Sequence, residues 1–346
     1  MINNNIFFPP EWHPQSAIQL TWPHINTDWE YMLEEVTACF VNIAVEILKR
    51  QQLIVVCCDA NLVKYELREY KDLFDNLRVI ELPSNDTWAR DHSGISILKD
   101  GKKCIYDFTF NGWGMKFASN YDNQITRGLF ANNVFEEDVQ LINRKDFVLE
   151  GGALESDGKG TLLTTSECLL SPNRNSYLTK DGVEKYLKET FGLKKVLWLD
   201  YGYLSGDDTD SHIDTLARFC DENTIVYVRC EDKGDEHYDA LRKMEQQLAT
   251  FRDYEGKAYK LIPLPMATPV YDEDNHRLPA TYANFLIINR AVLLPFYNDK
   301  EKDEKAKHIL QLAFPDREII GIDCTPLIQQ HGSLHCVTMQ YPEGFI

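Results

Sequence analysis

A two-strand unit with a polar turn recurs four times along this chain of 346 residues. Each copy has apolar or β-branched runs on both sides of an Asp-Gly, Glu-Asn or Asn-Arg turn, which is the signature of a β-hairpin. The four copies are GISILKDGKKCIYDF (94–108), GALESDGKGTLLTT (152–165), DTLARFCDENTIVYV (214–228) and YANFLIINRAVLLPF (282–296). This regularity predicts a repeat architecture.

Between the hairpins, an amphipathic stretch leads each time into a short apolar run. TKDGVEKYLKETFG leads to KKVLWLD, DEHYDALRKMEQQLA leads to YKLIPLP, and DEKAKHILQLAF leads to REIIGID. The first pattern predicts a helix and the second predicts a strand. Hairpin, helix and strand therefore recur with a period of roughly 60 to 70 residues.

The two ends of the chain supply the halves of a fifth hairpin. CVTMQYP (336–342) contains one strand, and SAIQLTWP (16–23) contains another that has no hairpin partner nearby in the sequence. Pairing of these strands would close the repeats into a ring and remove exposed sheet edges. We therefore expect one catalytic α/β domain over residues 1–346, a fivefold pseudosymmetric αβ-propeller of ββαβ units with helices outside and strands inside.

Acidic residues outnumber basic ones, with 54 Asp and Glu against 36 Lys and Arg and a formal net charge of −18. This charge disfavours binding to nucleic acid or to an anionic membrane, and it favours a small cationic ligand. The first residues, MINNNIFFPPEWHPQ, lack the basic and long apolar regions of a signal peptide, and no stretch is apolar enough for a membrane span.

Nine cysteines, without a CxxC pair, indicate free thiols in a reducing compartment. Cys57 and Cys58 lie in LIVVCCD, which reads as a buried strand, so both are expected to be packing residues. We therefore expect a cytoplasmic protein without structural zinc. A homo-oligomer, specifically a dimer, is the expected assembly.

Ionisable residues that strand patterning does not require stand just before the first strand of several hairpins. They are Asp91, Glu150, His212 with Asp214, and Cys336. Successive members lie 59, 62 and 124 residues apart, the last distance being two steps of 62. In a closed ring, equivalent positions converge on the axis, so these side chains are expected to share one central pocket.

Each of these residues has a plainer explanation when it is taken alone. Asp91 could cap its own turn, and Glu150 could pair with a surface lysine. His212 could be a structural histidine, and Cys336 could be a small buried hydrophobe. The shared repeat position favours a joint functional role over four separate structural ones.

A thiol and an imidazole together indicate nucleophilic catalysis with proton transfer. Cysteine proteases use the same pair, but several carboxylates around the thiol would repel a developing oxyanion and raise the thiol pKa. Such carboxylates suit a substrate that brings its own positive charge. A guanidinium is planar, permanently cationic and matches carboxylates with paired N–H groups. The residue types therefore favour guanidine chemistry over proteolysis.

Segments along nearly the whole chain resemble the agmatine deiminases of the guanidine-modifying, or pentein, superfamily and the related bacterial peptidylarginine-deiminase-type proteins. They are PPEWHPQSAIQLTWP, NDTWARDHSG, FNGWGMKF, LEGGALESDGKGTLLTTSECLLSPNRN, DDTDSHIDTLARF, YANFLIINRAVLLPFY and LHCVTMQYP. The resemblance implies the same fivefold αβ-propeller. It also implies hydrolysis of agmatine to N-carbamoylputrescine and ammonia, a step of putrescine and polyamine biosynthesis that needs no metal or cofactor.

At the matching positions, the resemblance implies a role for each of the five residues. Cys336 would be the nucleophile that forms an amidino-thioether, and His212 would be the general acid and base. Asp91 and Asp214 would clamp the guanidinium, and Glu150 would hold His212 in orientation.

Two departures from the family pattern concern the wall of the pocket. Asp208, six residues before Asp214, would bind substrate where agmatine-specific members usually carry Glu. The segment before Cys336 reads HGSLH, whereas many members read Gly-Gly-Gly-Asn-Ile-His. Both departures bear on the choice of substrate and leave the reacting groups intact. Trp88 and Trp113 either flank the substrate's methylene chain or cation, or pack in the core.

The candidate guanidine substrates differ in the chemical group at the end opposite the guanidinium. Agmatine ends in an amine that an acidic pocket tolerates, whereas free arginine needs a cation for its carboxylate. Arg90 and Arg218 lie beside catalytic segments, but each is one step from a strand and is expected to point away. Agmatine is therefore favoured over free or peptidyl arginine. Amidino transfer to an amine, cysteine protease activity and a non-catalytic role as a pentein-like binding protein are less favoured hypotheses.

Overall fold

The computed structural model describes residues 5–346, and these residues form five β-sheets. In spatial order, the first sheet contains β1 (Ile6–Phe7), β5 (Ile95–Lys99), β6 (Lys102–Thr109) and β7 (Gln140–Val148). The second contains β10 (Lys195–Leu199), β9 (Thr161–Thr165) and β8 (Glu155–Ser156), and the third β11 (Ala217–Asp221), β12 (Thr224–Arg229) and β13 (Lys260–Pro265). The fourth contains β14 (Leu286–Ile288), β15 (Ala291–Phe296) and β16 (Glu318–Asp323), and the fifth β17 (Thr338–Pro342), β2 (Gln15–Thr21), β3 (Gln52–Cys57) and β4 (Leu77–Glu81).

Every sheet is built around an antiparallel pair of strands with a parallel strand beside it. Four of the antiparallel pairs are the hairpins expected from the sequence: β5/β6, β8/β9, β11/β12 and β14/β15. In the turn between β5 and β6, Asp100 has φ of 51° and Gly101 has φ of 76°, as a type I′ turn requires. The hairpin predictions are therefore confirmed.

The fifth sheet brings distant parts of the chain together. β17 pairs antiparallel with β2, with Thr338 opposite Leu20, and β2 pairs in parallel with β3. The predicted split hairpin is thus confirmed. The prediction that Cys58 packs in the strand is wrong, because β3 ends at the buried Cys57 and Cys58 is exposed just before the helix cap Asp59.

The helices that were expected between the hairpins are present. The α-helices are α1 (Leu33–Leu48), α2 (Ala60–Glu66), α3 (Ala89–His92), α4 (Gly112–Met115), α5 (Ile125–Ala131), α6 (Ser166–Leu169), α7 (Pro172–Asn175), α8 (Lys180–Phe191), α9 (Tyr238–Thr250), α10 (Lys300–Ala313) and α11 (Thr325–Ile328). The 3₁₀ helices are η1 (Glu30–Met32), η2 (Arg68–Asn76), η3 (Asp122–Gln124), η4 (Gly151–Ala153) and η5 (Ile213–Thr215). Side chains fix two of the long helices at their starts, because Thr179 caps α8 and Asp299 caps α10.

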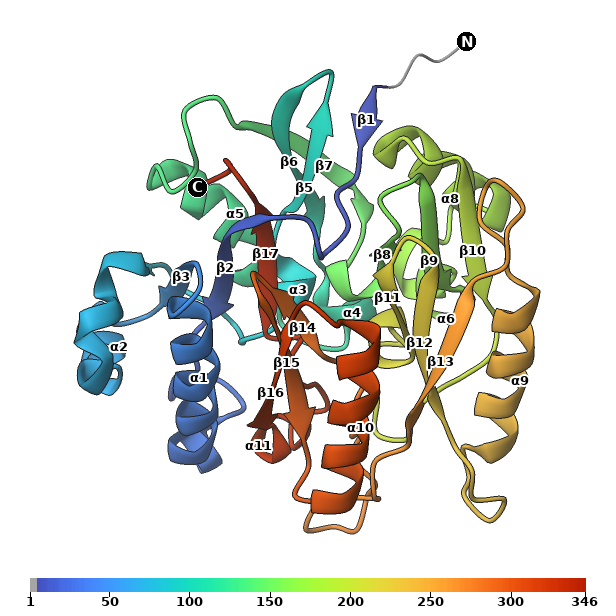
Figure 1. Ribbon diagram of the computed structural model, residues 1–346. Coiled ribbons are helices and arrows are strands. Elements are labelled where there is room, and N and C mark those ends of the chain that lie inside the picture. Colours follow the sequence, from blue (N-terminus) through green and yellow to red (C-terminus); the bar gives the residue numbers. More distant parts are fainter. Residues whose placement is uncertain (1–4) are drawn as a thin grey trace.

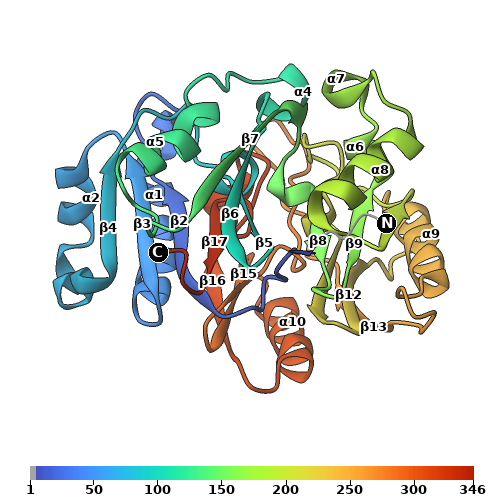
Figure 2. The ribbon, with the colours of Figure 1, turned by 90° about the horizontal axis from the view of Figure 1, so that it is seen from above.

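The long helices lie at the outer edge of the molecule. Figure 1 shows α1, α8, α9 and α10 around the strands, whereas the short helix α3 lies near the middle. In the view turned by 90°, α1 and α2 lie beside β3 and β4, and α9 lies at the opposite side (Figure 2). The apolar faces of α1, α9 and α10 share the largest core cluster with strands of four sheets. Within residues 5–346, no helix combines the length and apolar character that crossing a membrane requires.

Candidate active site

Short turns directly before hairpin strands carry the five site residues named from the sequence. Asp91 lies in α3 before β5, and Glu150 is the N-cap of η4 before β8. His212 is the N-cap of η5 and Asp214 lies within it, ahead of β11. Cys336 lies two residues before β17. The fold therefore presents these side chains from equivalent points of four sheets.

Asp91, His212 and Glu150 form one contiguous buried group. Nδ1 of His212 lies 3.6 Å from Oδ1 of Asp91, and its Nε2 lies 3.3 Å from Oε2 of Glu150. The backbone N–H of Gly152 donates to Asp91 Oδ1 over 2.9 Å and Trp113 Nε1 donates to Oδ2 over 2.9 Å. The two carboxylates limit the orientation of the imidazole ring of His212 and favour its protonated form.

Arg174 binds the carboxylate of Glu150 that also contacts His212, and the sequence pattern did not single it out. Its Nε donates to both carboxylate oxygens of Glu150, over 3.0 and 2.8 Å, and its Nη2 donates to the carbonyl of Thr209 over 2.9 Å. Nη1 of Arg174 pairs with Asp210. The only signal in the sequence was the position of Arg174 within the segment SPNRN, which forms α7.

His335, the residue before Cys336, bridges two carboxylates. Its Nδ1 lies 2.7 Å from Oδ2 of Asp214, and its Nε2 lies 2.6 Å from Oε2 of Glu11. Oδ1 of Asp214 is buried and has no hydrogen-bond partner within the described part of the chain. Because buried polar atoms are normally paired, this oxygen is available to a donor from a ligand.

Asn284 contacts the thiol segment, and it too was missed. Its Oδ1 lies 3.4 Å from Cys336 Sγ and accepts from the backbone N–H of His335 over 2.8 Å, while its Nδ2 donates to the carbonyl of Asp214 over 3.3 Å. Asn284 stands two residues before β14. This is the place in the fourth hairpin that corresponds to the other site residues, so the repeat pattern contained the signal.

A pocket of about 100 Å³ opens onto the thiol. Cys336, Asp91, Trp88, Trp113 and Asp208 all contribute to its wall. The remaining lining residues are Asp28, Asp86, Phe117, Thr209, Gln330, His331 and Gly332. Among residues 5–346, four aspartates and no lysine or arginine therefore line this pocket. Glu150, His212 and Asp214 are fully buried and do not line the pocket, so only Asp91 and Cys336 of the five expected residues contribute to its wall.

Trp88 and Trp113 both line the pocket and pack in the hydrophobic core. The indole of Trp88 donates from Nε1 to Asp86 over 3.0 Å, and that of Trp113 donates to Asp91. Each is more than nine-tenths buried, and each belongs to the large apolar cluster. The two roles considered from the sequence, lining the pocket and packing the core, therefore belong to the same side chains.

The surroundings of Cys336 disfavour its thiolate. Burial raises the pKa of this thiol well above its ordinary value, and the carboxylates of Asp214 and Asp91 raise it further. The thiol is therefore neutral at neutral pH in the free protein. A cation that enters the pocket offsets the two carboxylates and lowers the cost of forming the thiolate.

The surroundings of His212 have the opposite effect on the imidazole. Burial alone would lower its pKa, but Asp91, Cys168 and Glu150 together raise the pKa well above the usual value. His212 is therefore protonated at neutral pH. At the pocket wall, burial raises the pKa of Asp208 to about 6, against the opposing effect of His331.

A family model of Porphyromonas-type peptidyl-arginine deiminases matches residues 7–342. The chain belongs to this family. A Porphyromonas gingivalis protein of known structure, provisionally named an arginine deiminase, is 60% identical, with a TM-score of 0.95 and coverage of 99% of this chain and 100% of that one. A C. jejuni agmatine deiminase with a cysteine-to-serine substitution and bound substrate is 39% identical, with a TM-score of 0.91 over 100% of this chain and 99% of that one. The agmatine deiminase of Medicago truncatula is 31% identical over 96% of each chain. The resemblance found in the sequence is thus confirmed.

In this deiminase-family protein, Arg90 and Arg218 point away from the pocket, as expected. Arg218 is fully buried and pairs with Glu11 and Glu155. Nη1 of Arg90 donates to Oε1 of Gln340 over 2.6 Å, on the other side of the catalytic turns. Neither guanidinium is therefore placed to bind a substrate carboxylate at Cys336.

One group of side chains in the deiminase-family protein has the donor set of a metal site. The ligand atoms of Glu150, Cys168 and His212 all lie within 4.8 Å of one another, as judged from residues 5–346. The guanidinium of Arg174 already binds both oxygens of Glu150 and would repel a metal cation. The expectation that the reaction uses no metal or cofactor stays a prediction.

Proposed function

We propose that this deiminase hydrolyses agmatine to N-carbamoylputrescine and ammonia. Relatives that cover nearly the whole chain are named agmatine deiminases, and one of them was solved with substrate bound. The observation that carries the proposal is the set of acids at the thiol. Asp91 lines the pocket beside Cys336, and Asp214, whose charge acts on the thiol, has a buried oxygen without a hydrogen-bond partner among residues 5–346. A guanidinium supplies a positive charge for both carboxylates and an N–H donor for the unpaired oxygen of Asp214.

The proposed reaction proceeds through a covalent adduct on Cys336. Binding of the guanidinium between Asp91 and Asp214 lowers the thiol pKa, and the thiol proton leaves to solvent. Sγ then bonds to the guanidinium carbon, and protonated His212 gives its proton to the departing nitrogen, which leaves as ammonia. Neutral His212 next takes a proton from water, and the hydroxide adds to the same carbon. The C–S bond then breaks with its electron pair going to sulfur, and the hydroxyl proton passes to that sulfur, which releases the ureido product and restores the neutral thiol and protonated His212.

Glu150 acts in this scheme as a positioning residue. Its carboxylate orients His212 through Nε2 and raises the imidazole pKa. The histidine is thereby held as the acid that the first step needs. Fixing both the guanidinium and the acid contributes part of the roughly 7 to 11 kcal/mol available from well-oriented reactants.

The pocket wall favours agmatine over arginine. Asp28, Asp86 and Asp208 line the pocket, which has no lysine or arginine to receive an α-carboxylate. Trp88, Trp113 and Asp208 are proposed to contact the substrate's chain and amine. The family name favours peptidyl arginine as the second candidate, because a peptide bond removes that carboxylate. Retention of the thiol and imidazole argues against a purely binding role.

Product analysis with three substrates tests the proposal. The enzyme is incubated with agmatine, free arginine and an arginine-containing peptide, and kcat/KM is measured from N-carbamoylputrescine, citrulline and peptidyl citrulline. Agmatine should be preferred, and an added amine acceptor should not capture the amidino group. A higher kcat/KM for the peptide would replace agmatine by peptidyl arginine in this proposal.

A trapped intermediate tests the assignment of residues. With agmatine, acid quenching of the wild-type enzyme during turnover should show an amidine-sized mass increase on the Cys336 peptide, and the His212→Ala variant should form this adduct and hydrolyse it more slowly. The Cys336→Ser variant should lose ammonia release by at least about a thousandfold, whereas Cys58→Ser, at the exposed thiol, should leave it unchanged. Ammonia release by Cys336→Ser at the original rate would exclude the mechanism.

The finer architecture and cellular setting belong to the same proposal. We infer that the five sheets make one fivefold pseudosymmetric αβ-propeller domain over residues 1–346; their common pairing pattern supports this inference.

The nine free cysteines support a cytoplasmic location. The acidic charge argues against nucleic acid as a partner. The expected homodimer is tested by measuring the mass in solution by sedimentation.

A further inference from the structure

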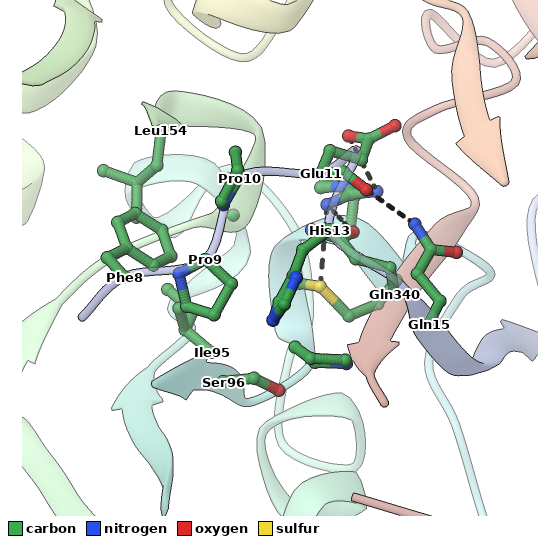
Figure 3. Close-up of a pocket in the computed structure, with 14 residues that line it drawn as sticks. Phe8, Pro9, Pro10, Glu11, His13, Gln15, Ile95, Ser96, Leu154 and Gln340 are labelled. Carbon is green, nitrogen blue, oxygen red and sulfur yellow. Dashed lines mark hydrogen bonds and ion pairs between the residues drawn. The ribbon is translucent and has the colours of Figure 1, made fainter. Parts of the chain in front are cut away.

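A second cavity, of about 40 Å³, lies behind the catalytic turns. Its wall has two kinds of residue, which Figure 3 shows on different sides: Phe8, Pro9 and Leu154 on one, and Glu11 and Gln340 on the other. Arg90 and Gly151, the neighbours of Asp91 and Glu150 in the sequence, also line the cavity, but Cys336 and Asp91 do not. The cavity is therefore separate from the pocket that contains the thiol.

Unused hydrogen-bond donors face this cavity. Arg90 is 3% exposed, and its Nη2 makes no hydrogen bond to any of residues 5–346. Ser96 is 8% exposed, and its Oγ has no partner in the described structure either. Gln340 accepts from Arg90 Nη1 through its Oε1 over 2.6 Å, so its partly exposed amide group lies beside these two donors. Buried donors without partners are rare and indicate a missing acceptor.

The acceptors nearby are already occupied. Glu11 accepts from Arg218 Nη2 over 2.7 Å, from the backbone N–H of Ile287 over 2.7 Å, and lies 2.6 Å from His335 Nε2. Its carboxylate lies 3.9 Å from Arg90 Nη2, beyond hydrogen-bond distance. The charge of Glu11 is thus neutralised by other groups, and the guanidinium of Arg90 is only partly compensated.

We propose that this cavity binds a small carboxylate with a short alkyl tail. The carboxylate accepts hydrogen bonds from Arg90 Nη2, Ser96 Oγ and the amide of Gln340. The alkyl tail packs against Phe8, Pro9 and Leu154. A cation of the same size would meet the guanidinium of Arg90, while Glu11, the one carboxylate among the residues that line the cavity, is already paired with Arg218 and His335. Water alone would satisfy the donors but would leave the apolar wall hydrated.

Arg90 connects this site to the catalytic turn. Its backbone N–H donates to the carbonyl of Cys336 over 3.1 Å, and its Nε donates to the carbonyl of His335 over 3.4 Å. An anion that engages Nη2 therefore binds a side chain that also supports the segment carrying the nucleophile. Occupancy of the cavity is expected to change agmatine turnover through this contact.

Calorimetric titration of the wild-type protein with butyrate tests the proposal, with n-butylamine as the cationic probe of equal length. The test variant is Ser96→Val, which removes the hydroxyl and fills the cavity on a strand where valine is favoured. The matched control is Ser93→Ala, because Ser93 is 7% exposed, has an unpaired Oγ and lies outside the cavity. Urea unfolding of each variant shows whether it is folded, and Ser96→Ala provides a milder second variant.

Butyrate should bind wild type and Ser93→Ala alike, should bind Ser96→Val more weakly by about tenfold or more, and n-butylamine should not compete with it. A structure with butyrate should place its carboxylate at Arg90 Nη2. Three results would overturn the inference: no saturable binding to wild type, equal binding to Ser96→Val, or only water in the cavity. Binding is measured without turnover, so this test is independent of the proposed deimination.

Discussion

At the level of single residues, the thiol of Cys336 provides a direct test of the site electrostatics. Its pKa is raised by burial and by the carboxylates of Asp214 and Asp91, so the thiolate fraction at any lower pH is smaller than for an ordinary thiol. The rate of alkylation by iodoacetamide should therefore rise about tenfold per pH unit up to about pH 9 without a plateau. Mass spectrometry of the Cys336 peptide measures this rate separately from the other cysteines.

Removing one of the two carboxylates should shift this profile in a known direction. Asp91→Asn lowers the pKa of Cys336, so alkylation at a given pH should become faster by about tenfold. The same change should slow deimination, because the guanidinium loses a charged partner. Asp72→Asn, at an exposed carboxylate in η2 that does not line the pocket, is the matched control. Slower alkylation of the Asp91 variant would contradict the assigned charge distribution.

Arg174 is expected to act on catalysis through Glu150 and His212. Arg174→Gln removes a positive charge beside Glu150, and this raises the pKa of His212 further. Because kcat falls when His212 loses its proton, the alkaline limb of the kcat profile should move to higher pH. The value of kcat should fall by about tenfold to a hundredfold, since Glu150 also loses its anchor.

Two further variants separate this positioning role from a general loss of structure. Arg174→Lys restores the charge but not the planar fork, so it should recover the pH profile and only part of kcat. Arg277→Gln, which removes a comparable pairing with Asp235 and Glu236 outside the pocket, should leave both unchanged. An unshifted profile in Arg174→Gln would show that Arg174 stabilises the fold without influencing His212.

At the level of elements, the turn η4 contains Gly151 and Gly152, which allow it to pack closely against the turns of two other sheets, the ones that carry Asp91 and His212. A Cβ on Gly152 would lie 2.4 Å from His212 Nδ1 and 2.8 Å from Asp91 Oδ1. Gly152→Ala should therefore displace both side chains and lower kcat by about a hundredfold. Gly182→Ala in α8, where the nearest atom would lie 3.3 Å away, should keep full activity. Agmatine assays on both folded variants measure the difference, and full activity in Gly152→Ala would contradict the assigned geometry.

The repeat pattern in the sequence was sufficient to predict the hairpins, the helices between them and the turns that carry Asp91, Glu150, His212 and Cys336. These features depend on local periodicity and turn chemistry, which neighbouring residues determine. The partners of the site residues depend on tertiary packing. His335 binds Glu11, 324 positions away, and no local pattern of charge indicates that pair. Arg174 was missed for the same reason.

Asn284 was missed for a different reason. It occupies the repeat position before β14, but an amide does not stand out among ionisable residues. Its role depends on the orientation of Oδ1 toward Cys336, which only coordinates provide. The wrong prediction for Cys58 has another cause. The apolar run LIVVCC indicates a strand, but it does not specify the residue at which the strand ends, which is Cys57.

At the level of the whole molecule, charge and site chemistry act in the same direction. The chain has a formal net charge of −18, and Asp28, Asp86, Asp91 and Asp208 line the pocket that leads to the thiol. A dication such as agmatine is attracted both by the net negative charge of the protein and by the aspartates that line the pocket. Its encounter with the enzyme should therefore depend on salt, because mobile ions screen the long-range part of this attraction.

The value of kcat/KM for agmatine should fall on the order of threefold to tenfold as the Debye length shortens from about 30 Å at 0.01 M salt to about 8 Å at 0.15 M. The value of kcat should change little, because the charges that contact the bound guanidinium are buried and poorly screened. Alkylation of Cys336 by uncharged iodoacetamide provides the control, because a neutral reagent is not attracted by the charge of the protein. The alkylation rate should therefore not fall with salt concentration as kcat/KM does. Equal salt dependence of the two reactions would mean that salt acts on the thiol itself. A kcat/KM independent of salt would mean that the buried acids alone, without the surface charge, select the cation.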